Sequence, residues 1–217
     1  VKKAAKILLK AKNPVILLGS RGKGAGCTQL YIQLAEMLHC PVFTTPRGKG
    51  SFPETHELTF RVFGFAGSPY TKAYIYENNP DLLLVIGSSL CEWATESWDP
   101  RMNPEKFLIQ IDSDPLEIGK NYPVSQGIVG DISTCMKVLI NKLNEFELSK
   151  SFPSLKEKTH RDTTLQSIKR NMGIFLEPDK MLSEESPIKP QRLMQDLHES
   201  LDENAIIISD AGNSYAW

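Results

Sequence analysis

Short apolar runs that end in glycine or polar residues recur along this chain. The clearest is Leu-Leu-Leu-Val-Ile at residues 82–86, which follows Asp81 and leads into Gly87-Ser88-Ser89. A run that is apolar at every position predicts a strand buried on both faces, as in a parallel sheet. Ligands of such sheets bind at the carboxyl ends of the strands, so we expect any binding site there. Similar runs predict strands at residues 15–18, 41–44, 107–111 and, more weakly, 126–130.

Helical patterns separate these runs. Apolar residues at helical spacing predict helices over residues 1–11, 28–39, 70–78 and 131–146. Residues 15–44 follow the order strand, glycine-rich turn, helix, strand, which predicts a right-handed parallel βαβ unit. Asp114 and Pro115 predict the N-cap and first residue of a short helix that ends near residue 120. The chain is therefore expected to form an α/β fold with a doubly wound, mainly parallel sheet flanked by helices.

Residues 47–69 show neither period and are rich in glycine, so we expect an irregular loop. A loop of that length inside a compact domain usually serves a function. After residue 147 the composition becomes polar, and residues 149–171 fit one solvated helix. The prolines of residues 172–190 indicate a linker.

A second α/β domain is expected near the end of the chain. Residues 191–201 predict an amphipathic helix, and residues 205–210 predict a strand with a glycine turn behind it. Val1 is not an initiator methionine, and Trp217 follows closely on this strand, so we expect a piece of a longer protein. The expected parts are a domain at 1–147, a polar helix and linker at 148–188, and a truncated domain at 189–217.

Composition narrows the class of protein. The 217 residues are 41% hydrophobic and carry a net charge of −1, which allows a sizeable core and gives no basic surface for nucleic acid. No apolar run is long enough to span a membrane. The four cysteines form no CxxC pair, which argues against a zinc site or a disulfide framework and for reduced thiols in a cytoplasmic protein. No histidine has a partner at metal or triad spacing.

The candidate chemistry lies at the expected strand ends. The turn Gly19–Gly26 could present backbone N–H groups to a phosphate, but it matches neither GxGxxG nor a P-loop, and a tight strand-to-helix turn explains it equally. Asp112 fits a ribose ligand or a solvent-facing acid. Asp114 fits a ribose contact and Asp131 a ligand contact, but helix caps are the favoured interpretation for both.

Several motifs in order resemble the central domain of thiamine-diphosphate-dependent 2-oxo acid enzymes, the group of acetolactate synthase, pyruvate oxidase, and benzoylformate and oxalyl-CoA decarboxylases. The resemblance covers residues 1–147 and resumes at 189–217, which is similar to the start of that family's diphosphate-binding domain. The motifs are Pro41-Val42-Phe43-Thr44-Thr45, Gly48-Lys49-Gly50-x-x-Pro53-Glu54-x-His56, Gly64-x-x-Gly67, Asp81 to Gly87, Ile109-Gln110-Ile111-Asp112-x-Asp114-Pro115, Val129-Gly130-Asp131, and Ile206 to Asn213.

The resemblance implies a six-stranded, Rossmann-like domain that holds FAD along its strand ends in the flavin-bearing members. The acetolactate synthases carry an arginine and paired acids after the strand that matches residues 82–86. Residues 88–92 here are Ser-Ser-Leu-Cys-Glu, which argues against FAD and leaves open a domain kept for packing. The matching cofactor-binding positions are Gly19, Ser20, Gly64, Gly67, Gly87, Ser88, Asp112, Asp114, Gly130 and Asp131.

The residues that such enzymes use for catalysis are expected outside this chain. The family needs a glutamate from a preceding domain and a GDG…N motif for Mg²⁺ and thiamine diphosphate, and Gly130-Asp131-Ile132 does not match that motif. No catalytic or metal-binding residue is therefore assigned, and the fragment alone is expected to be inactive. The full-length enzyme would be a homo-oligomer, dimer or tetramer, acting on a small 2-oxo acid. A stand-alone FAD- or NAD-binding module and a structural spacer are the alternatives.

Overall fold

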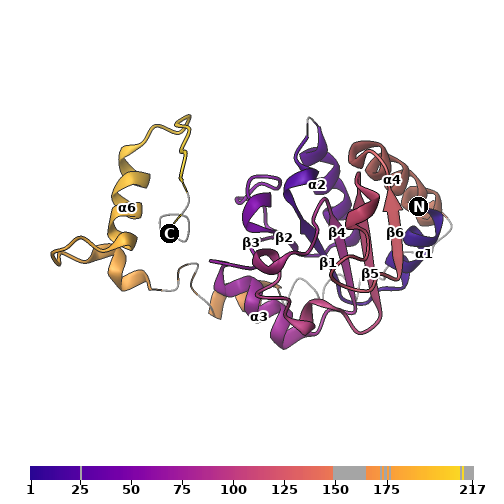
Figure 1. Ribbon diagram of the computed structural model, residues 1–217, viewed down its shortest axis with the longest axis horizontal. Helices are drawn as coiled ribbons and strands as arrows, with labels where there is room; N and C mark the ends of the chain where they lie inside the picture. The colour runs from indigo at the N-terminus through magenta and orange to yellow at the C-terminus, as the bar shows by residue number, and fades with distance from the viewer. Residues whose placement is uncertain are drawn as a thin grey trace. The chain divides into compact units, whose positions relative to one another are not determined.

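The computed structural model describes residues 1–24, 26–148, 165–171, 173, 175, 177–210 and 212 (Figure 1). The chain divides into two compact units, Val1–Met172 and Gly173–Trp217. Of the solvated helix expected at 149–171, only residues 165–171 lie within the described part. They are helical, but Leu165 and Ile168 are buried in the core, so this segment is not solvated on all sides.

The first unit is built on a six-stranded, fully parallel sheet in the order β3-β2-β1-β4-β5-β6. This confirms the predicted doubly wound α/β fold. The order proceeds from β1 to β3 in one direction and from β4 to β6 in the other, so it reverses between β1 and β4. The strands are β1 (Pro14–Leu18), β2 (Val42–Thr44), β3 (Thr59–Val62), β4 (Leu82–Ile86), β5 (Phe107–Asp112) and β6 (Gln126–Val129).

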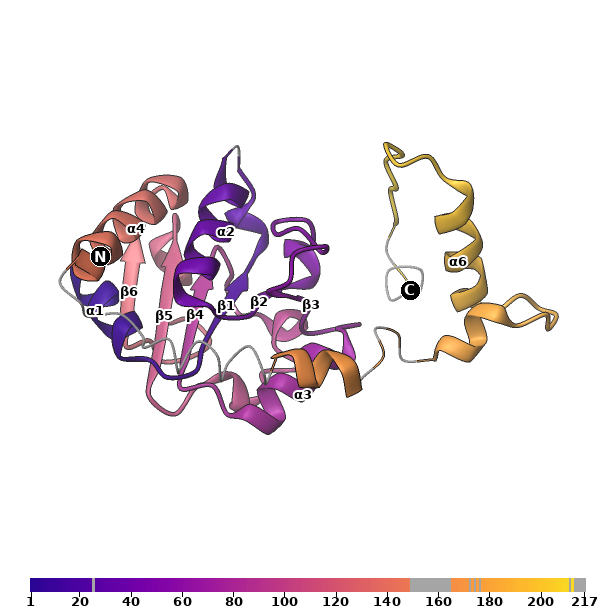
Figure 2. The ribbon, with the colours of Figure 1, turned by 180° about the vertical axis from the view of Figure 1, so that it is seen from behind.

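Helices cover both faces of this sheet. Right-handed crossovers place the helix between β1 and β2 and the helix between β3 and β4 on opposite faces, because these two connections run in opposite directions. Figures 1 and 2 show this arrangement, with α2 and α4 on one side of the sheet and α3 on the other. The helices are α1 (Lys2–Lys10), α2 (Cys27–Leu38), α3 (Pro69–Asn78) and α4 (Ile132–Leu148), and α4 packs against α1 and α2.

The two central strands confirm the prediction that continuous apolar runs form strands buried on both faces. Every residue of β1 and of β4 is buried. β4 lies between β1 and β5, with helices over both faces, so it has no solvent-facing side. Alternating polar residues would place unpaired polar groups in the core, and the continuous run avoids this.

The prediction of an irregular loop at 47–69 is wrong for four residues, which form β3. This strand pairs only with β2, at the edge of the sheet, and its register is shifted. Phe60 is buried, whereas Arg61 is partly exposed and has a left-handed φ of +59°. A short, distorted edge strand has neither a continuous apolar run nor a regular alternation, so the sequence pattern did not reveal it.

Two further predictions need correction. The short helix expected to reach residue 120 is a single turn, η5 (Pro115–Glu117), because the amide of Gly119 turns inward and donates to the side chain of Gln110. The strand expected at 205–210 is not formed. Ile206, Ile207 and Ile208 are 89%, 74% and 90% exposed. A strand needs a neighbour to take its backbone hydrogen bonds, and no paired strand is assigned among the described residues of the second unit.

In the described part of the second unit, a short helical turn, η6 (Pro178–Leu182), packs on α6 (Pro190–Ser200), which matches the helix predicted at 191–201. Over the described residues of both units, no helix combines the length and the apolar content that a bilayer crossing requires.

Candidate functional site

The carboxyl ends of the central strands lie side by side. Leu18 of β1 pairs with Ile86 of β4, and Ile86 pairs with Ile111 of β5. The amide of Gly130, just after β6, donates to the carbonyl of Asp112 at 3.0 Å. The structure therefore brings most of the predicted positions to one edge of the sheet: Gly19, Ser20, Gly87, Ser88, Asp112, Asp114, Gly130 and Asp131.

The glycines after β1 and β4 meet each other backbone to backbone. The amide of Gly19 donates to the carbonyl of Ile86 at 2.8 Å. A Cβ on Gly19 would lie 2.2 Å from the carbonyl oxygen of Gly87, and a Cβ on Gly87 would lie 2.2 Å from the amide nitrogen of Gly22. The turn η1 (Ser20–Gly22) thus packs directly against the end of β4, at the point where the strand order reverses. Contacts within the chain are sufficient to require glycine at both positions.

Gly64 and Gly67 lie in the loop after β3 and contact a different segment. A Cβ on Gly64 would lie 2.2 Å from the carbonyl oxygen of Trp93, and one on Gly67 would lie 2.7 Å from the carbonyl oxygen of Gly64. The amide of Phe65 donates to that same Trp93 carbonyl at 2.8 Å, and the Phe65 and Trp93 rings are 4.5 Å apart. The loops after β3 and β4 are therefore packed together through their backbones.

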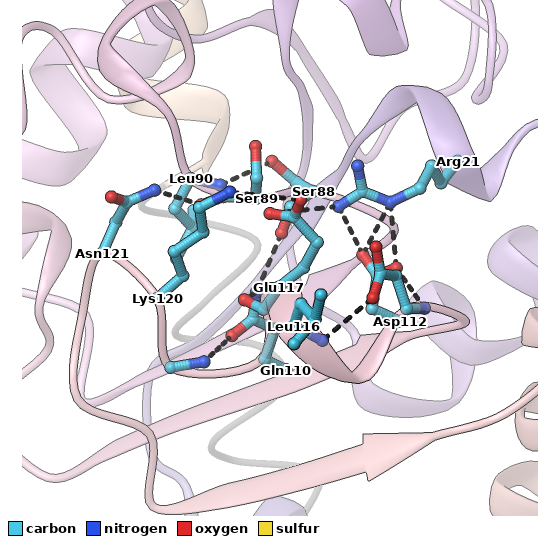
Figure 3. A network of polar contacts seen from close by, with 12 residues as sticks. Arg21, Ser88, Ser89, Leu90, Gln110, Asp112, Leu116, Glu117, Lys120 and Asn121 are labelled. Atoms are coloured by element: carbon cyan, nitrogen blue, oxygen red, sulfur yellow. Dashed lines mark hydrogen bonds and ion pairs between the residues drawn. The ribbon is translucent and has the colours of Figure 1, made fainter.

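A charged pair lies at the end of β5 (Figure 3). Asp112 is 0% exposed. The Nε of Arg21 donates to both carboxylate oxygens at 2.9 and 3.0 Å, and Nη2 donates to Oδ2 at 2.8 Å. The amide of Asp114 donates to Oδ1 at 3.0 Å. The alternative that Asp112 faces solvent is therefore wrong.

The guanidinium of Arg21 closes this carboxylate off from water. Its side chain is 34% exposed, so it forms part of the surface above a fully buried acid. The hydrogen bonds to Asp112 raise the pKa of the guanidinium above its already high ordinary value. A second acid, Glu117, lies 3.8 Å from Nη2, and Lys120 lies 3.4 Å from the other oxygen of Glu117. Acidic and basic side chains thus alternate along the carboxyl ends of the strands.

A buried glutamine fastens the loop after β5 onto the end of β4. Gln110 is 1% exposed, and its Nε2 donates to the carbonyls of Ser88 at 3.0 Å and Glu117 at 2.8 Å. Its Oε1 accepts the amide of Gly119 at 2.8 Å, so every polar atom of the side chain is used. Asn121 adds a bond to the carbonyl of Ser89 at 2.8 Å (Figure 3).

Asp114 and Asp131 both act as helix caps, as the favoured interpretation predicted. An Oδ1 of Asp114 accepts the amide of Leu116 at 2.9 Å. The Oδ1 of Asp131 accepts the side-chain hydroxyl of Thr134 at 2.7 Å and its amide at 2.8 Å. These bonds, the hydroxyl first, lower the pKa of Asp131. Ser88 plays a similar local role, because its Oγ accepts the amide of Leu90 at 3.2 Å.

The residues that organise this edge include three that the sequence did not single out, Arg21, Gln110 and Glu117. Gln110 interrupts the apolar run of β5, and a buried polar residue needs partners, so that interruption was a usable signal. Arg21 gave none, because its partner lies 91 residues away along the chain. Among the described residues there is no cluster of three or more His, Cys, Asp or Glu side chains that could hold a metal ion.

Comparison with known proteins places this domain in a family. Residues 1–139 match the family model described as thiamine pyrophosphate enzyme, central domain. The whole chain is 36% identical to a probable acetolactate synthase large subunit of Methanocaldococcus jannaschii, and covers 35% of that relative. Over 98% of its length it is 30% identical to the acetolactate synthase large subunit of Haemophilus influenzae, again covering 35% of the relative. The chain thus spans about a third of the length of these relatives. It belongs to the thiamine pyrophosphate enzyme family, as the ordered motifs predicted.

Proposed function

We propose that this chain is the central part of a thiamine-diphosphate-dependent enzyme that decarboxylates or carboligates small 2-oxo acids, as a lyase or transferase of the acetolactate synthase type. The observation that carries the proposal is the alignment with the Methanocaldococcus jannaschii relative, which extends over the entire chain at 36% identity. Similarity therefore continues beyond residue 139, where the match to the central-domain family ends.

The domain limits are part of this proposal. We assign residues 1–147 to the central domain, 148–188 to a polar helix and linker, and 189–217 to the beginning of the diphosphate-binding domain. The full-length protein would add thiamine-binding domains on both sides and would assemble as a homo-oligomer. Its proposed compartment is the cytosol, in keeping with the four free cysteines of this chain.

No residue of this chain is assigned to the chemical step. Bound thiamine diphosphate, held through Mg²⁺, supplies an electron sink for the pair left behind when a 2-oxo acid loses CO₂. In a GDG motif an acid follows a glycine, as Asp131 follows Gly130 here. Asp131 instead caps a helix, because its carboxylate accepts hydrogen bonds from Thr134. The central domain is proposed to act as a scaffold. Nucleotide binding at the strand ends stays a prediction from the sequence.

Product formation tests this assignment. The full-length protein, supplied with thiamine diphosphate, Mg²⁺ and pyruvate, is expected to release CO₂ and to form acetolactate or an aldehyde. The 217-residue chain under the same conditions is expected to form neither. Loss of activity after removal of Mg²⁺ with a chelator is the control for cofactor dependence. A complete protein inactive on pyruvate and on other 2-oxo acids would refute the function, whereas activity of the 217-residue chain would refute only the scaffold role.

A further inference from the structure

The acid that would bind a nucleotide's ribose is buried and already hydrogen-bonded within the chain. In a doubly wound sheet, an acidic residue at a strand end accepts hydrogen bonds from ribose hydroxyls. Asp112 occupies such a place, but a carboxylate offers about four acceptor positions. Arg21 makes three donor contacts of 2.8 to 3.0 Å with it, and the amide of Asp114 makes a fourth at 3.0 Å. Nε carries one hydrogen, which is shared between the two oxygens, so three N–H groups serve this carboxylate. Because the carboxylate is also 0% exposed, a ribose hydroxyl could reach it only if Arg21 moved aside.

The glycine-rich turn is equally occupied. A phosphate cradle needs backbone N–H groups that point at the ligand. In this turn the amide of Arg21 donates to the carbonyl of Gly87 at 3.1 Å, that of Gly22 to Gly19 at 3.1 Å, and that of Lys23 to Ser20 at 3.2 Å. The amide of Gly87 donates to β5 at 2.9 Å. These four amides, at the point where the strand order reverses, are therefore not available to a phosphate.

We propose that Arg21 is a built-in cation that takes the place of a nucleotide ligand, so that this central domain is closed and complete without FAD. The guanidinium lies over the buried Asp112 and beside Glu117 (Figure 3). It supplies the positive charge and the donors that the acidic strand end requires. The residues implied for FAD by the family resemblance therefore do not fit a flavin in this chain. The inference concerns binding and stability, and does not rest on the proposed reaction.

Urea unfolding of the 217-residue chain, with and without excess FAD or ADP, tests the proposal, because a ligand that binds the folded state raises the midpoint. The variants are Arg21→Ala and Arg21→Lys. Arg101→Ala is the matched control, since Arg101 forms a similar two-pronged pair with Asp99 but is 55% exposed. Quenching of flavin fluorescence on mixing gives a second, independent readout of binding.

The expected result is no effect of FAD or ADP on the wild-type midpoint and no quenching. Arg21→Ala should reduce the ratio of folded to unfolded protein by about tenfold to a hundredfold, less than for a fully buried pair because water reaches part of the guanidinium. Arg101→Ala should reduce it by no more than about fivefold. Arg21→Lys, which keeps the charge but loses the fork, should fall between wild type and Arg21→Ala.

Three results would overturn the proposal. FAD or ADP that raises the wild-type midpoint shows that these strand ends accept a nucleotide. An Arg21→Ala variant no less stable than Arg101→Ala shows that the edge does not need this cation. If Arg21→Ala does not fold at all, Arg21→Lys takes its place in the test. A urea midpoint of Arg21→Lys equal to that of the wild type would contradict the forked arrangement at Asp112.

Discussion

The close contact between the turn after β1 and the end of β4 predicts that replacing Gly87 strongly destabilises the fold. Gly87 has a φ of +66°, and a Cβ there would lie 2.2 Å from the amide nitrogen of Gly22 and 2.7 Å from the carbonyl carbon of Arg21. Both of these are backbone atoms, so no side chain can rotate away. An alanine at this position therefore meets a conformational penalty and a steric one at the same time.

Two other glycines separate these penalties. Gly19 has an ordinary extended backbone with a φ of −101°, but its Cβ would lie 2.2 Å from the carbonyl oxygen of Gly87, so Gly19→Ala carries the steric penalty alone. Gly50 has a φ of +85° and nothing within 4 Å of its Cβ position, so Gly50→Ala carries the conformational penalty alone. The three variants form a matched set within one domain.

The expected losses in the free energy of unfolding follow from these contacts. A left-handed alanine costs about 1–2 kcal/mol. Forcing a methyl group into packed surroundings costs about 1–3 kcal/mol. Each replacement of glycine recovers about 0.4–1 kcal/mol by restricting the unfolded chain. The net losses are therefore about 0.5–1 kcal/mol for Gly50→Ala, about 1–2 kcal/mol for Gly19→Ala, and about 2–4 kcal/mol for Gly87→Ala.

Urea unfolding followed by far-ultraviolet circular dichroism measures these differences. With a slope of about 2 kcal/mol per molar urea, Gly87→Ala should lower the midpoint by about 1–2 M, and an unchanged slope in all variants shows that only stability has changed. If Gly87→Ala is no less stable than Gly50→Ala, or Gly19→Ala unfolds with the wild type, the backbone contact between these turns is absent. Should Gly87→Ala fail to fold, the comparison of Gly19→Ala with Gly50→Ala still tests the steric term.

Three further predictions concern single contacts. Tyr31→Phe removes the 2.7 Å bond from a buried hydroxyl to the carbonyl of Gly22, and should lower the free energy of unfolding by about 1–2 kcal/mol; an unchanged urea midpoint would contradict it. Ser97 is exposed with a φ of +60°, so Ser97→Gly should raise the thermal midpoint by relieving about 0.5–1 kcal/mol of net strain, and a lowered midpoint would count against this. The hydrogen bonds from Arg101 lower the pKa of Asp99 below its ordinary 3.8, so the contribution of this pair is present above that pH and is lost as the pH falls through the lower pKa of the folded protein. The stability difference between wild type and Asp99→Asn should therefore shrink in acid, and a difference that stays constant with pH would refute the assignment.

The local sequence predicted those parts of the site whose hydrogen bonds join residues close together in the chain. Asp114 and Asp131 cap helical turns through residues two and three positions ahead, and short-range bonds of this kind follow from residue order. The pairing of Arg21 with Asp112 joins residues 91 positions apart, and nothing in either neighbourhood specifies the other. At Gly19, Gly64, Gly67 and Gly87 the nearest neighbours are backbone atoms of the same chain, whereas at Gly130 the neighbour is the sulfur of Cys135.

The sequence by itself determined the strands β1, β2, β4, β5 and β6 and the helices α1, α2, α3 and α4, because each depends on a hydrophobic period within its own segment. Tertiary structure alone decided whether marginal segments become strands. Residues 59–62 pair at a sheet edge in spite of an irregular pattern, while the strongly apolar residues 206–208 pair with no strand within the described ranges and form none. Tertiary structure also decided which polar groups at the strand ends have partners within the chain. Long-range contacts use the side chains of Asp112 and Gln110, and a hydrogen-bonding group already used within the chain is not available to a ligand.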